Sequence, residues 1–494
     1  MKSTVELTDI QGLVRGSYSK LKEGCYFVLG IRDPAAARTW LAKQKFASVA
    51  DGPAPDTALQ VAFTFCGLKE LGVSQPIQDG FPHDFRSGMA SGAARSRRLG
   101  DIGPNDPNCW HWGGPSKAPP HVLIMLFAKT PPGSVGLQSL SSTLRDDLWS
   151  RAFDELACLS TSDMCGTEPF GFADGISQPT LDWERRMPVH VRNTRNYTNM
   201  SALGEFLLGY PNEYARYTDR PLLDRRDDPH DILLVAEDVP GKKDFGRNGT
   251  YLVLRDLAQD VAAFQKYVGD PAKQLPGNQY SVAEAMVGRT KLGAPIVARE
   301  SQPIEGTDDA RNQFTFRNDP DGTACPLGAH IRRANPRNAD LPDGTKGLLS
   351  RLWRTLGFGG KRARYDLLES SRFHRMLRRG REYGPLTNEE AGSERRSDEQ
   401  GLRFICLNAN ILRQFEFVQN SWIANPKFDG LEEADPLLGN RRPLLDETAT
   451  NTFTCPQESG INRRYENLPT FVTVRGGAYF FMPSLRALRY ICGR

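Results

Sequence analysis

The stretch that most constrains this chain is Glu168-Pro-Phe-Gly-Phe-Ala-Asp-Gly-Ile-Ser-Gln-Pro179. It sets one acid, Asp174, between Gly171 and Gly175, with two phenylalanines just before it. Glycines allow positive φ angles and close approach of the backbone to a ligand. Aromatic neighbours exclude water from a carboxylate and favour its protonated form, which suits a group that shuttles protons. An isolated Asp-Gly is more often an ordinary turn, so this interpretation needs partners elsewhere in the chain.

Composition narrows the class of protein. A chain of 494 residues is too long for one hydrophobic core, so two domains, or three small ones, are expected. The net charge of +4 comes from nearly balanced totals and implies neither nucleic acid nor a membrane surface as a partner. No run of about 18 apolar residues offers a membrane-spanning helix. The start of the chain carries no export signal, which predicts a cytoplasmic protein.

The nine cysteines exclude several metal and redox sites. No C-x-x-C pair occurs, so the sequence offers no zinc ribbon, no redox motif of that kind and no covalent haem attachment. Cys25, Cys66 and Cys406 stand inside apolar runs, where reduced core thiols are expected.

Hydrophobic patterning predicts strands that alternate with helices, which is typical of α+β domains. In the first half the predicted elements are strand 24–31, helix 34–46, strand 59–65, strand 121–127 and helix 137–157. In the second half they are strand 251–255, helix 257–268, strand 402–407, helix 410–423, paired strands 471–474 and 478–481, and helix 483–491. The second half thus repeats the scheme of the first. We predict an N-terminal domain over 1–182, linker and covering loops over 183–230, and a C-terminal domain over 231–494 with a basic insertion at 339–373.

One histidine stands in unusual surroundings. His330 follows Cys325-Pro-Leu-Gly-Ala, a small and apolar flank that would let a flat ring approach the backbone. Arg332, Arg333 and Arg337 come directly after it and offer guanidinium donors for carboxylates. This pattern fits a haem with two propionates, and a helix start with a polar cap explains it equally well.

A pair of arginines follows in Leu377-Arg-Arg-Gly380. Such a pair often marks an exposed helix end, but Met376 and Leu377 before it favour one arginine, Arg378, pointing into an apolar pocket. His374 lies nearby after Arg372-Phe, at a spacing that does not match a distal peroxidase arginine and histidine. We therefore assign His374 no catalytic role.

Together these motifs resemble those of the dye-decolorizing peroxidases. The resemblance rests on Gly171-Phe-Ala-Asp-Gly175, Cys325-Pro-Leu-Gly-Ala-His330-Ile-Arg, Asn335-Pro-Arg337 and Leu377-Arg-Arg-Gly380, and extends along most of the chain. Length and the lack of an export signal are similar to the larger, non-secreted branch. The resemblance implies two ferredoxin-like α+β domains with antiparallel sheets, and one haem b held mainly by the second.

The resemblance also implies roles for three residues. His330 matches the proximal iron ligand, Asp174 the distal acid and base, and Arg378 the distal arginine. Either Arg332 or Arg333 is expected to hold a propionate.

Further residues of the pocket follow from the same resemblance. An acid is expected to steady the ligand histidine, with Asp435 as the first candidate and Glu416 as the second. Leu402 and Phe404, at alternate positions of one strand, match the apolar residues that restrict the distal space.

The implied activity is a haem peroxidase that uses hydrogen peroxide to oxidise dyes, phenols and other small reductants in one-electron steps. Bulky dyes would react at the surface by electron transfer through Trp422 or Tyr383, although core packing explains both aromatics as well. An aspartate as the proton shuttle predicts best activity at acidic pH. The alternatives are a non-catalytic haem-handling protein and an enzyme like the chlorite dismutases. A homo-oligomer is left open, and neither nucleic acid nor membrane is expected as a partner.

Overall fold

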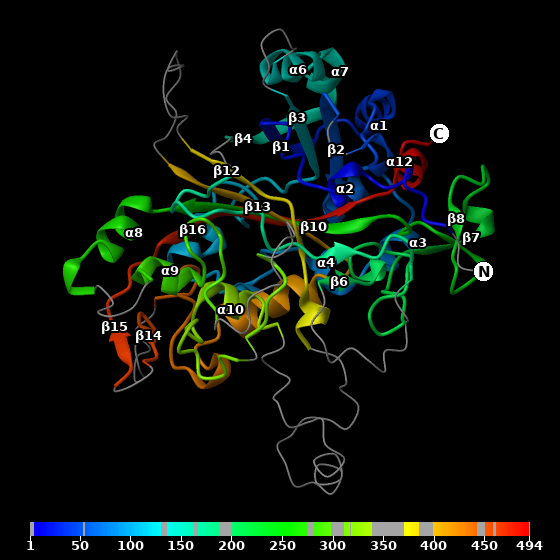
Figure 1. Ribbon diagram of the computed structural model, residues 1–494. Coiled ribbons are helices and arrows are strands. Elements are labelled where there is room, and N and C mark those ends of the chain that lie inside the picture. Colours follow the sequence, from blue (N-terminus) through cyan, green and yellow to red (C-terminus); the bar gives the residue numbers. More distant parts are fainter. Residues whose placement is uncertain are drawn as a thin grey trace, which may run out of the picture.

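The computed structural model of the protein is shown in Figure 1. It describes residues 4–52, 55–129, 136–162, 166–186, 199–273, 280–297, 311–316, 318–337, 370–384, 399–441, 450–457 and 461–493. Most of the predicted basic insertion, residues 339–369, lies outside this described part.

A nine-stranded sheet runs through the molecule in the order β11-β13-β10-β16-β2-β3-β1-β4, and β12 also pairs with β13 (Figure 1). The strands of the first half are β1 (Glu23–Ile31), β2 (Thr57–Phe63), β3 (Val122–Ala128) and β4 (Phe153–Thr161). Those of the second half are β10 (Thr250–Gln259), β11 (Leu377–Arg378), β12 (Arg381–Tyr383), β13 (Gln400–Asn408) and β16 (Val472–Met482). Pairing within the sheet is antiparallel throughout.

The two halves of the sheet have the same topology. In each half the first strand, β1 or β10, lies between the third and the fourth, and the second strand lies outside the third. This is the order of a ferredoxin-like fold, so the predicted α+β class and the repeat of the strand–helix scheme are confirmed. The halves join where β2 meets β16, through Phe63 opposite Phe481.

The sheet is covered on both faces, which explains why its central strands read as continuous apolar runs. Phe27 and Val253 belong to the core on one face, whereas Tyr26 and Leu252, one residue away, belong to the core on the other. The sheet also curls until its far ends meet. The N–H of Ser162, just after β4, donates to the carbonyl of Glu382 in β12 at 2.9 Å.

Helices and short strands surround the sheet. The helices are α1 (Pro34–Lys43), α2 (Phe65–Glu70), α3 (Gln75–Asp79), α4 (His83–Ser87), α5 (Ala93–Leu99), α6 (Leu137–Leu144), α7 (Asp147–Ala152), α8 (Val261–Val268), α9 (Val282–Val287), α10 (His330–Ala334) and α12 (Leu485–Ile491). The short strands are β5 (Thr180–Leu181), β6 (Met200–Ser201), β7 (Leu222–Asp224), β8 (Leu234–Val235), β9 (Lys242–Asp244), β14 (Phe453–Cys455) and β15 (Arg463–Tyr465). In the part of the chain that is described, no helix is long and apolar enough to cross a bilayer.

The predicted helix over 137–157 is confirmed only in part, because it is divided into α6 and α7 and its last five residues belong to β4. A new helix, α7, starts where the Asp146 carboxylate accepts the N–H of Trp149, and the chain then turns into the edge strand β4 from Phe153 onward. From Phe153 onward, strand pairing with β1 outweighs the helical spacing of the apolar residues.

The predicted turn between strands 471–474 and 478–481 is also wrong, because β16 runs through Gly476 and Gly477 as one strand. The glycines instead make room for neighbours. A Cβ on Gly476 would meet the Trp112 ring at 2.4 Å, and one on Gly477 would meet the Met89 sulfur at 2.8 Å.

Two predicted helices differ in detail. The segment predicted as helix 410–423 is helical but wound as a π-helix over Leu412–Glu416 and Val418–Ile423. The helix predicted over 257–268 begins only at Val261, because β10 continues to Gln259 and Asp260 caps the helix through the N–H of Ala263.

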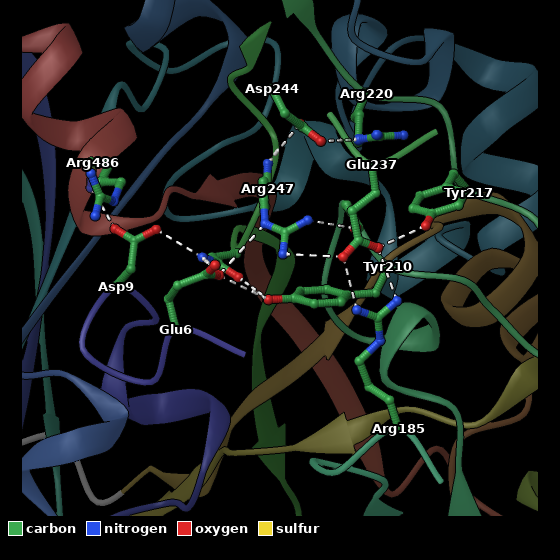
Figure 2. A network of polar contacts seen from close by, with 12 residues as sticks. Glu6, Asp9, Arg185, Tyr210, Tyr217, Arg220, Glu237, Asp244, Arg247 and Arg486 are labelled. Atoms are coloured by element: carbon green, nitrogen blue, oxygen red, sulfur yellow. Dashed lines mark hydrogen bonds and ion pairs between the residues drawn. The ribbon is translucent and has the colours of Figure 1, made fainter. Parts of the chain in front are cut away.

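The loops after residue 199 are fastened by charged networks. Figure 2 shows Glu237 at the centre of one of them. Its carboxylate accepts two hydrogen bonds of 2.9 Å from Arg185 and one of 2.8 Å from Tyr217, and Arg247 lies 3.6 Å away. Arg247 also approaches Glu6 to 3.5 Å, so the network ties these loops to the start of the chain.

Candidate active site

A cavity of about 700 Å³ lies against the second half of the sheet. Asp174, His330 and Arg378 all line it. These residues are far apart in the sequence, since Arg378 follows Asp174 by 204 residues and His330 lies between them. Its volume is within the range of about 300–1,000 Å³ that is typical of ligand and cofactor sites.

The Asp174 turn is built by its own backbone. Gly171 and Gly175 adopt φ angles of 94° and 77°, which only glycine takes without strain. The Glu168 carboxylate accepts the N–H groups of Phe170 and Phe172, both at 3.0 Å. These bonds fix the turn at the wall of the cavity.

The phenylalanines cover Asp174 less than the sequence suggests. The Phe170 ring packs on Phe264, with centroids 4.3 Å apart, and both phenylalanines of the turn are buried. The side chain of Asp174 nevertheless stays 32% accessible, so its carboxylate is open to the cavity.

Arg378 lies in direct contact with Asp174 at the wall of the cavity. Its Nη1 lies 3.3 Å from Asp174 Oδ1, and its Nη2 donates to the carbonyl of Ser177 at 3.4 Å. Its backbone N–H donates to Gln178 Oε1 at 3.0 Å, which couples β11 to the Asp174 turn. The next arginine, Arg379, donates instead to the carbonyls of residues 13 and 14, so the strand sends the two arginines in different directions.

His330 opens α10, and its ring is held from behind. The Nδ1–H donates to Asp435 Oδ2 at 2.9 Å, which leaves Nε2 as the nitrogen that can bind a metal. Asp435 is fully buried, and its Oδ1 accepts the N–H groups of Leu437 and Leu438. Burial disfavours the charged carboxylate, but the His330 ring and these donors hold the pKa of Asp435 below its usual value.

The second candidate for this role lies elsewhere. Glu416 accepts hydrogen bonds from Arg95 at 2.9 Å, Arg98 at 3.1 Å and the Tyr479 hydroxyl at 3.0 Å. Of the two predicted acids, the structure brings only Asp435 to His330.

Neither arginine expected to hold a propionate lines the cavity. Arg332 pairs with Asp319 at 2.9 Å and donates to the carbonyl of Cys325. Arg333 donates to three carbonyls, of Trp422, Asn425 and Glu433. Both are fully buried structural arginines, and their contacts give the propionate prediction no support.

Other arginines crowd the cavity. Eight line it, against three acids: Arg15, Arg255, Arg289, Arg337, Arg375, Arg378, Arg379 and Arg381, with Asp101, Glu168 and Asp174. Burial and the nearby charges of Arg337 and Arg378 lower the pKa of Arg289 to about 9. An anionic ligand would relieve this repulsion, so the charge of the cavity fits a group that carries carboxylates. No local motif marks Arg289, whereas Arg337 was visible beside His330.

Apolar side chains form much of the remaining wall. Leu402 and Phe404 both line the cavity from alternate positions of β13, as predicted for one face of a strand. Leu437 and Leu438 line it as well, directly after Asp435. A flat apolar ring system with carboxylate substituents matches these walls and the arginines.

The predicted surface aromatics differ in their relation to the cavity. Trp422 lines it, and its ring contacts those of His374 and Phe417 edge-on, at 5.1 and 5.3 Å. Tyr383 does not line it, and its ring lies 3.5 Å below the Arg403 guanidinium. His374 donates from Nδ1 to the carbonyl of Arg413, and burial lowers its pKa to about 4.

Within the described residues, no cluster of three or more His, Cys, Asp or Glu side chains could hold a metal ion. His330 and His374 both line the cavity, and one histidine such as His330 is the protein ligand set of a metal carried by a macrocycle.

The chain was compared with known proteins. No family model matches it. It is 32% identical to the multifunctional dye peroxidase of an Amycolatopsis species over 444 residues, which cover 87% of this chain and 81% of the relative. It is 29% identical to a dye-decolorizing peroxidase of Mycetinis scorodonius over 524 residues, which cover 99% and 88%.

Solved structures agree with these relatives. The fungal DyP-type peroxidase of Auricularia auricula-judae matches with a TM-score of 0.70 at 25% identity, covering 100% of this chain and 99% of that one. The DyP-type peroxidase of Anabaena has the same fold, with a TM-score of 0.69 at 22% identity over 98% and 94% of the two chains. Sequence relationship and shared fold thus lead to one conclusion: the chain belongs to the dye-decolorizing peroxidase family.

Proposed function

We propose that this haem peroxidase binds the iron of haem b through His330, moves the protons of hydrogen peroxide with Asp174, and assists that transfer with Arg378. The observation that carries the proposal is that one cavity is lined by both His330, backed by Asp435, and the Asp174–Arg378 pair. A site for peroxide chemistry needs a metal ligand, a proton carrier and a cation, and these residues supply all three.

The haem would be held through His330 in the cavity that the Asp174 turn also lines. When bound, haem supplies the redox-active iron at which peroxide is reduced. Leu402 and Phe404 would offer apolar contacts to the ring, and Arg289 and Arg337, which line the cavity, are the candidate partners for a propionate. Asp435 would fix the tautomer and orientation of His330 and increase its basicity as a ligand.

Asp174 would accept a proton at a carboxylate oxygen and return it to the oxygen that leaves as water. The accessible fraction of its side chain supports this role, because a small substrate in the cavity can reach the carboxylate. Arg378 would orient Asp174 through Nη1 and stabilise negative charge that develops on the peroxide.

Small phenols and other small aromatic reductants are the proposed substrates, with bulky dyes oxidised at the surface. Leu402 and Phe404 line the cavity and would restrict it, so large molecules would need a remote route. Trp422 has the better support, because it lines the cavity, whereas a cation over the Tyr383 ring disfavours loss of an electron there. Trp422→Phe should lower dye turnover and leave phenol turnover unchanged. Turnover of both substrates at the wild-type rate would contradict the route.

Neither alternative function gains support. A protein that only stores or delivers haem has no use for an acid paired with an arginine in the same cavity. An enzyme like the chlorite dismutases needs a distal arginine but no Gly-x-x-Asp-Gly turn, and the relatives from Mycetinis scorodonius and Amycolatopsis are peroxidases.

The test is to purify the protein with haem, measure haem per chain from the Soret band, and follow oxidation of a phenol after adding hydrogen peroxide. We expect one haem per chain and oxidation that depends on peroxide. A protein that binds haem but consumes no peroxide would contradict the proposed function.

A further inference from the structure

A pair of cysteines on neighbouring strands stands apart from the cavity. Cys25 lies on β1 and Cys158 on β4, and their Sγ atoms are 3.0 Å apart, although the two thiols are free. Cys158 pairs with Phe27 in the ladder, so the cysteines are diagonal neighbours on the two strands. Cys25 is buried and Cys158 is exposed, so the Cys158 thiol is open to solvent and the Cys25 thiol contacts it from the protein interior.

A cation sits beside the exposed thiol. Arg145 Nη2 lies 3.8 Å from Cys158 Sγ, and the guanidinium is held by Glu155 through bonds of 2.7 and 2.8 Å. The hydrogen bond from Cys25, aided by the charge of Arg145, lowers the pKa of Cys158, while the same bond and burial raise the pKa of Cys25. Both effects favour a thiolate at Cys158, which is the reactive form of a cysteine.

We propose that Cys25 and Cys158 form a peroxide-reactive dithiol, which hydrogen peroxide converts into a disulfide between β1 and β4. The oxidant is the substrate that a peroxidase meets in any case. Neither cysteine lines the haem cavity, so the reaction is separate from the proposed haem chemistry.

The reaction has two balanced steps. In the first, Cys158 Sγ attacks one peroxide oxygen, an S–O bond forms, the O–O bond breaks, and the leaving hydroxide takes a proton to become water. In the second, Cys25 Sγ attacks Cys158 Sγ, the S–S bond forms, and the S–O bond breaks with release of a second water that carries the Cys25 proton. Two thiols lose two electrons and one peroxide gains them.

The disulfide would pin β4, the strand at one end of the sheet order, to its neighbour β1. Among the strands that the structure describes, β4 pairs in the ladder only with β1. A covalent link between the two strands would therefore keep β4 from separating from the sheet under the oxidising conditions in which the enzyme works.

The test uses reduced holoenzyme treated with increasing hydrogen peroxide, then catalase, then a maleimide that blocks remaining thiols. Peptide mapping at acidic pH should find Cys25 joined to Cys158, with the mass of two hydrogens lost. Cys66, which is also exposed, serves as the internal comparison, and we expect Cys158 to react about tenfold faster than Cys66.

Three variants separate the steps. Cys25→Ser should leave Cys158 as a sulfenic acid that dimedone traps, because the second thiol is missing. Cys158→Ser should leave Cys25 unoxidised, because the buried thiol does not meet peroxide. Asp174→Asn tests independence from the haem: an unchanged rate of cross-linking supports direct attack by Cys158, even if peroxidase activity is lost.

Several results would overturn the proposal. They are Cys66 oxidised while Cys25 and Cys158 stay reduced, Cys158 joined to another cysteine, oxidation of Cys25 in Cys158→Ser, or cross-linking that slows together with turnover in Asp174→Asn. The last result would assign the oxidation to the haem instead of to peroxide itself.

Discussion

Two acids serve the cavity, and the structure holds them in opposite ways. Asp174 stands on a loop, keeps 32% of its side chain accessible and meets Arg378 at 3.3 Å. Asp435 is completely buried, meets His330 at 2.9 Å and accepts two backbone N–H groups on its other oxygen. The first carboxylate has room to exchange a proton with a ligand, whereas the second has every oxygen occupied.

The difference shows how one residue type can perform two tasks. A buried carboxylate with fixed donors stays charged and orients its partner, as acids behind metal-binding histidines do. A carboxylate open to a cavity can change its protonation with each turnover. In the proposed mechanism, the environment of each carboxylate, and not its chemical type, decides whether it orients a ligand or transfers a proton.

The largest effect is expected on the His330 side. His330→Ala should abolish the Soret band, because the only metal ligand proposed for the cavity is removed. His374→Ala is the matched control, since His374 lines the same cavity and should retain haem. Full haem content in His330→Ala would refute the ligand assignment.

The next largest effect is expected at Asp174. Asp174→Asn keeps the size of the side chain but cannot carry the proton, so peroxidase turnover should fall by about 10²–10⁴-fold with haem retained. The acidic optimum expected of the wild-type pH profile should vanish with it. A wild-type optimum above pH 8, or turnover preserved in the variant, would argue against the shuttle.

A smaller loss should follow at Arg378. Arg378→Leu removes the cation beside Asp174 and should slow turnover by roughly 10²-fold, as loss of one stabilising donor does in comparable sites. Arg379→Leu serves as the comparison, because its side chain bonds to carbonyls of residues 13 and 14. If Arg379→Leu loses more turnover than Arg378→Leu at equal haem content, Arg379 and not Arg378 is the distal arginine.

The mildest effect on turnover is expected at Asp435. Asp435→Asn should bind haem about 10–100-fold more weakly, because the orientation of His330 is no longer fixed by a charged acceptor. Haem transfer to a competing haem-binding protein measures this loss. Glu416→Gln should leave haem affinity unchanged, since Glu416 bonds to Arg95 and Arg98 instead; a loss there as large as at Asp435 would contradict the account.

The sequence predicted the parts of this site that depend on short motifs. The glycines at 171 and 175 indicated the turn, and Leu377 before Arg378 indicated which arginine of the pair contacts Asp174, although Arg379 lines the cavity as well. The propionate prediction for Arg332 or Arg333 gains no support, because neither side chain lines the cavity. Arg332 lies two positions after His330 and therefore projects from another side of α10, while nearby carbonyls occupy Arg333.

The fold was predictable to a similar degree. Apolar runs indicated β1, β3 and β10, but the joining of the halves depends on Phe63 meeting Phe481 across more than 400 residues. No local pattern reveals such a contact. The strand through Gly476 likewise depends on Trp112 packing where a side chain would stand, which only tertiary structure shows.

The most direct test of the two roles is a stopped-flow comparison of Asp174→Asn and Asp435→Asn, both loaded with haem, after mixing with hydrogen peroxide. The rate of the peroxide-dependent change in the Soret band should fall at least about tenfold further in Asp174→Asn, because Asp174 is the group proposed to move the proton. Equal losses in the two variants, or a greater loss in Asp435→Asn, would contradict the division between a transferring and a holding carboxylate.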